Sequence, residues 1–393
     1  MNFTWKSPKI IIGKEATGKF YYRREIFENE VWKEIEKGNN VLIAAPRRVG
    51  KTSVMKFMTD NPRENFKLIF RNVQGIDDET QFYKTIYQLI IICLNKFTKN
   101  KTMIQNYLSK MKISEISTTG IKIETKDIDY LTEINNLIPQ LDKDGENIVL
   151  LIDELPEVLH NLYLKGQKET ALNILKNLRH WRQEDEFKKI QFVLAGSIGI
   201  HYVVNAIAGR SSDINDLYKM IYQPLTEKEV IDYIISVTKD ASVKYNEELI
   251  TYLKSKIQYF VPYFINLMLD EIDRSAVKIN NINITTENID EAFNNIIKNN
   301  DHFSDWKKRL LDYMPKEDFL FINEILTQIA HNEQINIQFI YDIAVKHNKE
   351  IEFMDLLKDL EQDGYIVESN KNYIFISPFL KEFWKQNNPI KNA

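Results

Sequence analysis

The residues of this chain that could bind phosphate lie together in one short segment. Residues 45–52 match the pattern G-x-x-x-x-G-K-S/T at every position but the first, where Ala45 stands in place of glycine. In such a loop, backbone N–H groups and the N-terminus of the next helix surround the phosphates, while the lysine neutralises them and the hydroxyl binds Mg²⁺. We therefore expect Mg²⁺-bound ATP to be held by Ala45, Pro46, Arg47, Arg48, Val49, Gly50, Lys51, Thr52 and Ser53.

One position of this loop departs from the pattern, and two others carry a positive charge. Ala45 implies a first position that does not need a positive φ, because alanine is strained there where glycine is not. Arg47 and Arg48 could contact phosphate or acidic residues of a neighbouring domain, although such side chains often point away from the phosphates. The role of both arginines therefore stays open at this stage.

A pair of carboxylates further along the chain could complete a hydrolytic site. Asp153 and Glu154 directly follow the apolar run Ile148–Ile152, the pattern known as Walker B. Asp153 is expected to bind Mg²⁺ through its water shell, and Glu154 to orient or deprotonate the attacking water. Paired acids after a strand also occur in ordinary solvated turns, but a preceding phosphate-binding loop favours the functional interpretation.

Two further residues are candidates for contacts with the γ-phosphate. Ser197 follows the apolar run Phe192–Ala195, so its hydroxyl could contact the γ-phosphate or the attacking water. Arg210, after Gly209, could stabilise charge in the transition state, in its own chain or in a neighbouring subunit. A generic turn and a solvent-exposed loop arginine are the respective alternatives.

The elements that must position these residues alternate between strands and helices. Strands are predicted at 41–45, 68–73, 148–152 and 192–195, and helices at 80–97 and 171–181. Such alternation is typical of an α/β fold with a parallel sheet. The polar stretch 98–145 is interpreted as an insertion with one helix.

Strands give way to helices after Pro224. Thr226 and Glu229 predict a capping box at the start of a helix, and helical patterns continue to about residue 300. Beyond that, helices are predicted at 317–329, 337–346 and 353–362, followed by a two-stranded ribbon at 365–368 and 373–377. Three helices and a hairpin indicate a winged helix.

Composition sets limits on the protein class. The chain of 393 residues is too long to fold around a single hydrophobic core, so more than one domain is expected. The net charge of −4 disfavours a protein that coats nucleic acid nonspecifically. Cys93, the single cysteine, lies in an apolar run and is expected to be a buried thiol. No apolar run reaches the length of a membrane span, so we expect a cytoplasmic protein without membrane contact.

Together these motifs resemble the archaeal-type ATPases, a group similar to the STAND and AAA+ branches of the P-loop NTPases. The resemblance rests on the phosphate-binding loop, the Walker B run, the Ala195-Gly196-Ser197 strand end and Gln223-Pro224-Leu225-Thr226. It implies a P-loop NTPase sheet of order 5-1-4-3-2, a helical lid and a C-terminal winged helix. The corresponding domains are residues 1–224, 225–299 and 300–393.

The resemblance also implies a role for Arg24. Tyr22-Arg23-Arg24-Glu25 is similar to a Gly-Arg-Glu box that borders the adenine, although Arg23 stands where the family often has glycine. Phe260-Val261-Pro262 replaces a lid Gly-x-Pro segment, which puts a contact from Pro262 to the nucleotide in doubt.

Three functions fit these observations. The first is an ATP-hydrolysing regulatory switch acting on a protein partner or through self-association, and the second is a DNA-handling ATPase. The third is a nucleotide-binding scaffold, against which Glu154 argues. DNA is disfavoured because residues 349–363 carry six acids against Lys349 and Lys358, a charge that phosphates would repel.

Overall fold

The structure, a computed structural model, describes residues 4–46, 48–97, 113–116, 121–123, 128–141, 145–196, 200–209 and 212–390. The chain divides into two compact units. The first comprises Met1–Tyr22, Ala45–Gly50 and Gln223–Ala393, and the second comprises Arg23–Ala44 and Lys51–Tyr222. The predicted phosphate-binding loop is therefore divided after Gly50.

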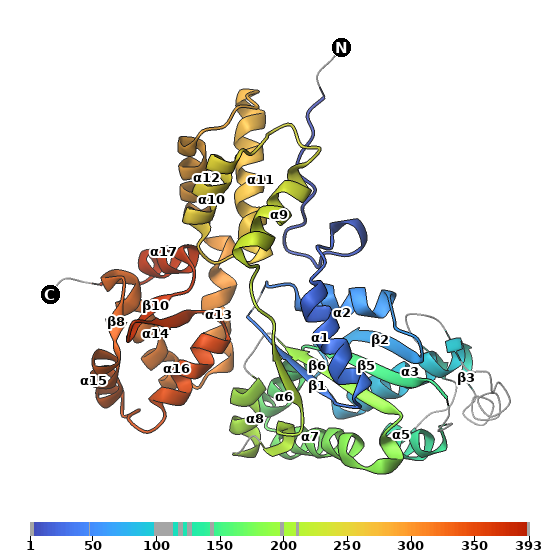
Figure 1. The fold of residues 1–393 in the computed structure, drawn as a ribbon. Helices are drawn as coiled ribbons and strands as arrows, with labels where there is room; N and C mark the ends of the chain where they lie inside the picture. Colours follow the sequence, from blue (N-terminus) through green and yellow to red (C-terminus); the bar gives the residue numbers. More distant parts are fainter. Residues whose placement is uncertain are drawn as a thin grey trace. The chain divides into compact units, whose positions relative to one another are not determined.

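The second unit contains a five-stranded sheet in which every neighbouring pair is parallel (Figure 1). Its order is β2-β5-β6-β1-β7, with bounds β1 Val41–Ala44, β2 Phe66–Asn72, β5 Asn147–Asp153, β6 Ile190–Gly196 and β7 Tyr218–Ile221. Counted within this sheet alone, the strands run 5-1-4-3-2. The labels differ in detail from that count because a hairpin, β3 Ile113–Ile116 and β4 Ile121–Ile123, precedes β5 in the chain.

Burial explains why the two interior strands β5 and β6 gave the clearest sequence signals. All of β6, and β5 from Ile148 onward, are buried, because helices cover both faces of an interior parallel strand. Continuous apolar runs follow from that burial. The edge strand β7 instead exposes Tyr218 and Ile221, and the sequence analysis did not locate it.

Helices surround this sheet in the second unit. The predicted helices correspond to α3 and α7, and the Cys93 thiol is buried on α3 as expected. The bounds are α1 Glu25–Glu36, α2 Lys51–Asp60, α3 Glu79–Phe97, α5 Tyr130–Leu137, α6 Leu155–Leu164, α7 Lys168–Gln183 and α8 Ile200–Ala208, with 3-10 turns η2 Ile138–Gln140, η3 Asp185–Phe187 and η4 Ser212–Ile214.

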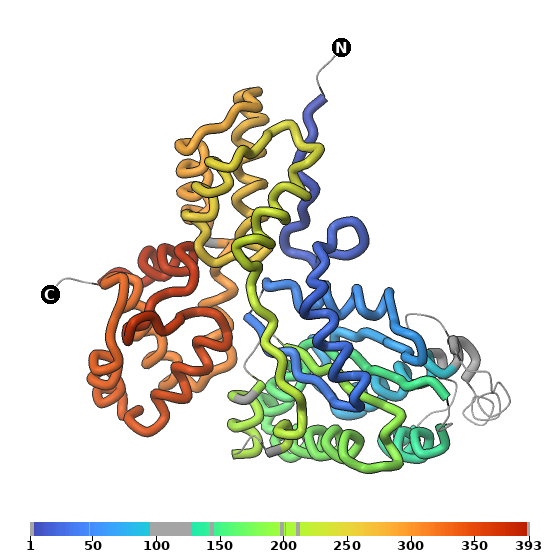
Figure 2. Tube along the Cα trace, in the orientation of Figure 1, coloured from blue at the N-terminus to red at the C-terminus, as the bar shows by residue number. Residues whose placement is uncertain are grey.

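The first unit begins with a segment that runs beside helices more than two hundred residues away in the chain (Figure 2). The Trp5 indole N–H donates to Asp273 at 3.0 Å, and the Lys9 N–H donates to the Val237 carbonyl at 2.8 Å. The elements here are η1 Gly18–Phe20, α9 Glu227–Thr238, α10 Glu247–Ile257, α11 Pro262–Ile279 and α12 Thr286–Lys298.

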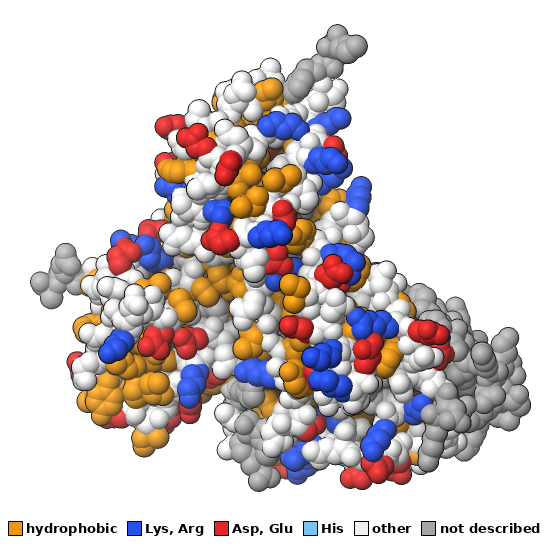
Figure 3. Space-filling view, viewed as in Figure 1, with side chains coloured by type: hydrophobic (Ala, Val, Ile, Leu, Met, Phe, Trp, Pro, Cys, Tyr) orange, Lys and Arg blue, Asp and Glu red, His pale blue; other side chains and the backbone are white. Residues whose placement is uncertain are grey.

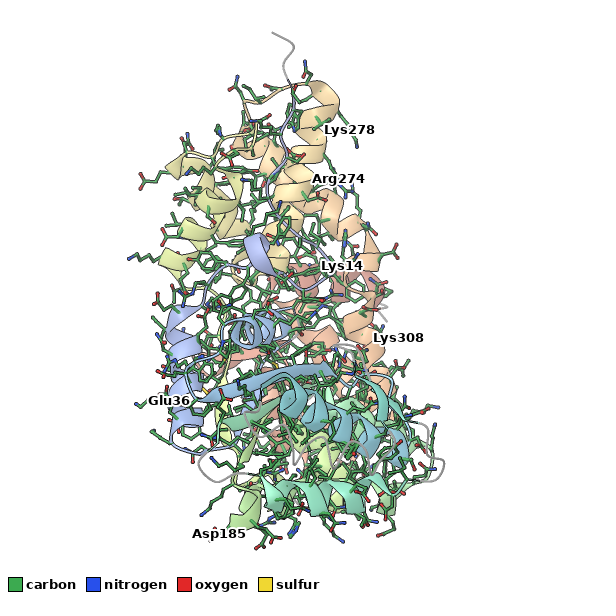
Figure 4. All side chains as sticks on the ribbon, turned by 90° about the vertical axis from the view of Figure 1, so that its right-hand side faces the viewer. Lys14, Glu36, Asp185, Arg274, Lys278 and Lys308 are labelled. Carbon is green, nitrogen blue, oxygen red and sulfur yellow. The ribbon has the colours of Figure 1, made fainter. Side chains whose placement is uncertain are left out.

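Local sequence rules account for the ends and faces of these helices. The predicted capping box is confirmed: Thr226 accepts from the Glu229 N–H, and the Glu229 carboxylate accepts from the Thr226 N–H. On α11, Arg274 and Lys278 lie one turn apart on the exposed side (Figure 4). The opposite side of α11 is apolar and buried, as expected for an amphipathic helix.

The C-terminal part of the first unit combines helices with a three-stranded sheet of order β8-β10-β9. The predicted helices and ribbon are present, whereas β8, α13 and α17 were not predicted. The bounds are η5 Asn300–His302, α13 Ser304–Tyr313, α14 Lys316–Asn332, β8 Ile335–Asn336, α15 Ile337–His347, α16 Phe353–Gln362, β9 Ile366–Ser369, β10 Asn372–Phe375 and α17 Pro378–Asn387.

Among the described residues, no helix is both long enough and apolar enough to cross a bilayer.

Candidate active site

A hydrogen bond between Thr52 and Asp153 joins two of the predicted site elements. Thr52 is the second residue of α2, and Asp153 is the last residue of β5. The Thr52 hydroxyl donates to Asp153 Oδ2 at 2.5 Å, across 101 positions of sequence. The parallel sheet makes this possible, because the carboxyl ends of its strands meet at one edge, where β1 also ends.

The Asp153 carboxyl group is fully buried, with none of its surface exposed. Burial raises the pKa of Asp153 above its usual range, and the neighbouring Glu154 charge raises it further. The Thr52 hydrogen bond and the charge of Lys51 act in the opposite direction on this pKa. Lys51 is itself only 6% exposed, so one cation and one buried carboxylate share this region.

These residues fit a magnesium ion that takes most of its ligands from phosphate and water. Among the described residues, no group of three or more His, Cys, Asp or Glu side chains could hold a metal. Mg²⁺ commonly binds one or two protein oxygens and completes its shell with substrate phosphates and water. The Thr52 hydroxyl and the Asp153 carboxylate supply such a pair of hard oxygen atoms, and a cation would offset the cost of burying the carboxylate.

Glu154 is held at the junction of β5 and α6 in an unusual backbone conformation. Its φ is 64°, in the left-handed region that non-glycine residues rarely adopt. The Glu154 N–H donates to Asp153 Oδ1 at 3.1 Å, and its carbonyl accepts from the Glu157 N–H at 3.1 Å. Such conformations persist where the surroundings enforce them, and they cluster at active sites.

The close approach of β6 to α6 explains how this junction is enforced. A Cβ atom added to Gly196, the last residue of β6, would lie 2.5 Å from both Cγ and Cδ of Pro156. Pro156 occupies the first turn of α6, two residues after Glu154. Gly196 therefore allows the end of β6 to pack directly against the segment that orients Glu154.

The part of the predicted phosphate-binding loop that belongs to the first unit, Ala45–Gly50, has its own contacts there. Ala45 does not adopt a positive φ, as expected, whereas φ is 66° at Arg48 and 108° at Gly50. The Arg48 guanidinium lies 4.8 Å from the centre of the Tyr263 ring and 3.8 Å from the Asp305 carboxylate.

Pro46 is buried against Gly364, where an added Cβ would lie 2.6 Å from Pro46 Cβ. Gly364 also has a φ of 78°, a second reason for glycine at this position. The loop thus contacts α11, α13 and the segment after α16 within the first unit.

Arg24, the residue expected to border the adenine, is fixed within the second unit. It is 8% exposed, and its guanidinium lies 4.9 Å from the centre of the Tyr222 ring. The buried Glu28 carboxylate accepts from the Arg24 N–H at 3.0 Å and pairs with the Arg23 guanidinium at 2.9 Å. Glu28 thus holds the Arg24 backbone and the Arg23 side chain, while the Arg24 side chain lies over the Tyr222 ring.

The structure brings together Lys51, Thr52, Asp153 and Glu154 in the second unit. Arg47, Ser197 and Arg210 lie outside the described residues, so their predicted roles are unchanged. Several residues with a positioning effect escaped the sequence analysis. Gly196 was noted there only as part of the Ala195-Gly196-Ser197 strand end, without a packing role; the others are Glu28, Pro156, Tyr222, Tyr263, Asp305 and Gly364.

Comparison with known proteins gives a family and a fold for this chain. The model of a family described as an AAA-like domain matches residues 13–316. A Walker-type ATPase of Pyrococcus abyssi is 15% identical, with 94% of this chain and 98% of that chain covered at a TM-score of 0.60. The ORC2 protein of Aeropyrum pernix is 11% identical, with 92% of each chain covered at a TM-score of 0.50. No curated protein matches. At these identities the structural likeness shows a shared fold.

Replacing the buried carboxylate should stabilise the ligand-free protein. In the Asp153→Asn variant the amide can still bond Thr52 and the Glu154 N–H, without a buried charge. We expect a Tm higher by about 2–4 °C, the shift that about 1 kcal/mol gives in a unit of this size. Thermal unfolding without Mg²⁺ or nucleotide measures it.

The pH dependence provides the control for this prediction. Because its pKa is raised on folding, Asp153 binds its proton more tightly in the native state. Its contribution to stability is therefore lost as pH rises from the usual carboxyl range through the raised pKa. The Asn variant should lack this loss, and an identical pH dependence in both proteins would contradict the assignment.

Adding a methyl group at Gly196 should displace the α6 junction. Pro156 is a ring closed on its own backbone, so a Gly196→Ala side chain cannot be accommodated by a rotamer change. We expect a loss of about 1–3 kcal/mol in the free energy of unfolding, typical of overpacking, together with reduced nucleotide turnover. Gly166→Ala is a destabilised control, because its φ of 74° strains alanine although nothing lies near its Cβ; turnover lowered equally in both variants would count against a specific role of Gly196.

Proposed function

The chain belongs to the AAA-like domain family, and from this premise we propose that it binds Mg²⁺-ATP and hydrolyses it to ADP and phosphate. We propose further that this cycle is a nucleotide-controlled regulatory switch acting on a protein partner. The observation that carries the proposal is the Thr52–Asp153 hydrogen bond at the sheet edge, with the buried Lys51 before it in sequence and Glu154 after it.

Each of these side chains has a defined task in the proposed reaction. Bound Mg²⁺ would supply charge neutralisation for the β- and γ-phosphates. Thr52 and Asp153 would hold this ion, directly or through water, and the Lys51 ammonium would contact the same phosphates. The burial of Lys51 and Asp153 strengthens these interactions, because a low dielectric screens charge less than water does.

Glu154 is the proposed general base. Its carboxylate would accept a proton from the water that attacks the γ-phosphate, with its position set by the junction of β5 and α6. Ser197 is proposed to contact the γ-phosphate or this water, and Arg210 to stabilise negative charge in the transition state.

The remaining predicted contacts complete the proposed nucleotide site. Residues 45–53 would surround the phosphates with N–H groups, and Arg24 would border the adenine from its fixed position beside Tyr222. The structure of the Aeropyrum ORC2 protein is of ADPNP and ADP complexes, which supports a nucleotide as the ligand of this fold.

The proposed domain roles follow from the same reasoning. Residues 1–224 would form the ATPase core, although residues 1–22 and 45–50 pack with the first unit. Residues 225–299 would form a helical lid, and 300–393 a winged helix built on α14, α15, α16 and the β9–β10 ribbon. A relation to the STAND branch fits a switch and is part of the proposal.

The contacts of Arg48 support a switch rather than simple hydrolysis. This loop residue is paired with Asp305 at the start of α13 and with the Tyr263 ring on α11. A phosphate-binding loop that also contacts C-terminal elements can transmit nucleotide binding to them, because binding and loop conformation are thermodynamically linked. The ion pair is half-exposed, so its contribution is of order 0–1 kcal/mol, small enough for a nucleotide to reverse.

DNA handling is the second candidate, favoured by the proposed winged helix. The charge of α16 and its flanks opposes it, because DNA readers of this kind require lysine and arginine on that helix. We therefore favour a switch that acts on a protein partner over DNA handling.

Substitutions at Lys51 and Glu154 should separate binding from hydrolysis. Lys51→Ala should weaken ATP binding at least about tenfold, equivalent to about 1.4 kcal/mol. Glu154→Gln should retain binding and lose turnover by about 10²-fold or more, because an amide cannot act as a base. Calorimetric titration with ATP and a phosphate-release assay measure the two effects. Unchanged affinity in the first variant, or unchanged turnover in the second, would refute the corresponding role.

A double-mutant cycle at Arg48 tests the switch. Arg48→Ala and Asp305→Asn should change the Kd for ATP in the same direction, by about two- to fivefold, if their coupling is of order 0.5–1 kcal/mol. The double variant should then show no more than the larger single effect. Asp301→Asn, a nearby exposed acid, is the control; strictly additive effects would show that Arg48 and Asp305 act independently on ATP binding and not through their ion pair.

A further inference from the structure

Helix α15 exposes a second apolar stripe in addition to the one that it buries. Ile337, Tyr341 and Val345 are 38%, 38% and 47% exposed, and they follow one another at intervals of four residues along one face. The packing of α15 is already accounted for by Ile340, Ile343 and Ala344, which are buried. A surface helix normally needs only one such stripe, so the exposed one calls for a separate explanation.

The exposed stripe continues onto the neighbouring segment. The Tyr341 ring contacts the Phe353 ring of α16 edge-on, with centroids 5.7 Å apart. Ile351, between the two helices, is 91% exposed, and Met354 is 41% exposed. Figure 3 shows hydrophobic side chains gathered over the end of the first unit that carries α15. We call Ile337, Tyr341, Val345, Ile351 and Met354 the α15 surface.

The charges around the α15 surface are predominantly negative. Residues 337–363 contain seven carboxylates and three lysines. Each lysine is paired with a carboxylate: Lys346 with Glu324 at 2.8 Å, Lys349 with Asp318 at 2.5 Å and Lys358 with Asp355 at 3.6 Å. Glu350 and Glu352 lie on either side of Ile351, and the excess of carboxylates over lysines leaves this segment with net negative charge.

We propose that the α15 surface docks a basic amphipathic segment of a protein partner. Leucine-like side chains of that segment would cover the exposed stripe, while its lysines and arginines would meet the carboxylates around it. Contiguous exposed apolar surface with a polar rim is typical of a protein interaction site. The partner's role rests on the proposed switch, whereas its docking requires no nucleotide.

The test uses the full chain without ATP and a synthetic helical peptide of leucine and lysine, with leucine on one face. We expect binding that weakens with added salt, and at least tenfold weaker binding to the same peptide with glutamate in place of lysine. The double variant Tyr341→Ser/Val345→Ser should lose at least tenfold in affinity. Ile279→Ser, which removes a 64% exposed side chain from α11, should bind as the wild type does.

A second variant protects the test against loss of folding. Glu350→Gln/Glu352→Gln changes only exposed groups and should weaken binding about threefold, with an unchanged Tm. Equal affinity of the wild type and both double variants for the lysine peptide would overturn the proposal.

Two other outcomes would assign the surface to a different occupant and also overturn the proposal. One is a concentration-dependent dimer that the Tyr341→Ser/Val345→Ser variant abolishes, which would make the occupant a second copy of the chain. The other is salt-sensitive binding of duplex DNA that is lost in the same variant. Phosphate release by the full chain is measured separately, so failure of peptide docking and failure of the proposed ATPase are distinguishable.

Discussion

The arrangement of the candidate site depends on one buried carboxylate. Asp153 has no exposed surface, and a buried charge is tolerated only when other groups compensate it. Here the Thr52 hydroxyl, the Glu154 N–H and the charge of Lys51 provide that compensation. These groups come from the start of α2 and the end of β5, so the parallel order of the sheet is a precondition for the site.

The same edge of the sheet stores backbone strain. Glu154 adopts a left-handed φ of 64°, a conformation that costs a non-glycine residue of order 1 kcal/mol or more. Pro156 and Gly196 fix the segment that follows, because the end of β6 leaves no room for a side chain there. Strain at Glu154 and close packing at Gly196 are therefore two aspects of one junction.

The first unit contrasts with this tight packing. Arg48 interacts with Asp305 and Tyr263 through a half-exposed ion pair and a cation–π contact, both of which are individually weak. Pro46, by comparison, is buried against Gly364. A loop with one firm and one weak attachment can change its side-chain contacts without loss of its backbone position.

The sequence by itself determined the elements whose signals are local. These elements are the strands β5 and β6, with their continuous apolar runs, the capping box at Thr226, and the predicted phosphate-binding loop. Each can be recognised from a few residues that are close together in the chain. The fifth strand, β7, was missed because its four residues are mostly exposed and include Lys219, so they form no continuous apolar run. The short strand β8 has only two residues and gave no periodic signal.

Only the tertiary structure decided which distant residues meet. Nothing in the sequence near Arg48 specifies Asp305 or Tyr263, and nothing near Pro156 specifies Gly196, because such pairs depend on how elements pack across the chain. The exposed stripe of α15 is a similar case. The sequence of α15 places apolar residues on more than one face of the helix. Only the structure showed that the face with Ile340, Ile343 and Ala344 is buried and that the other apolar face is exposed.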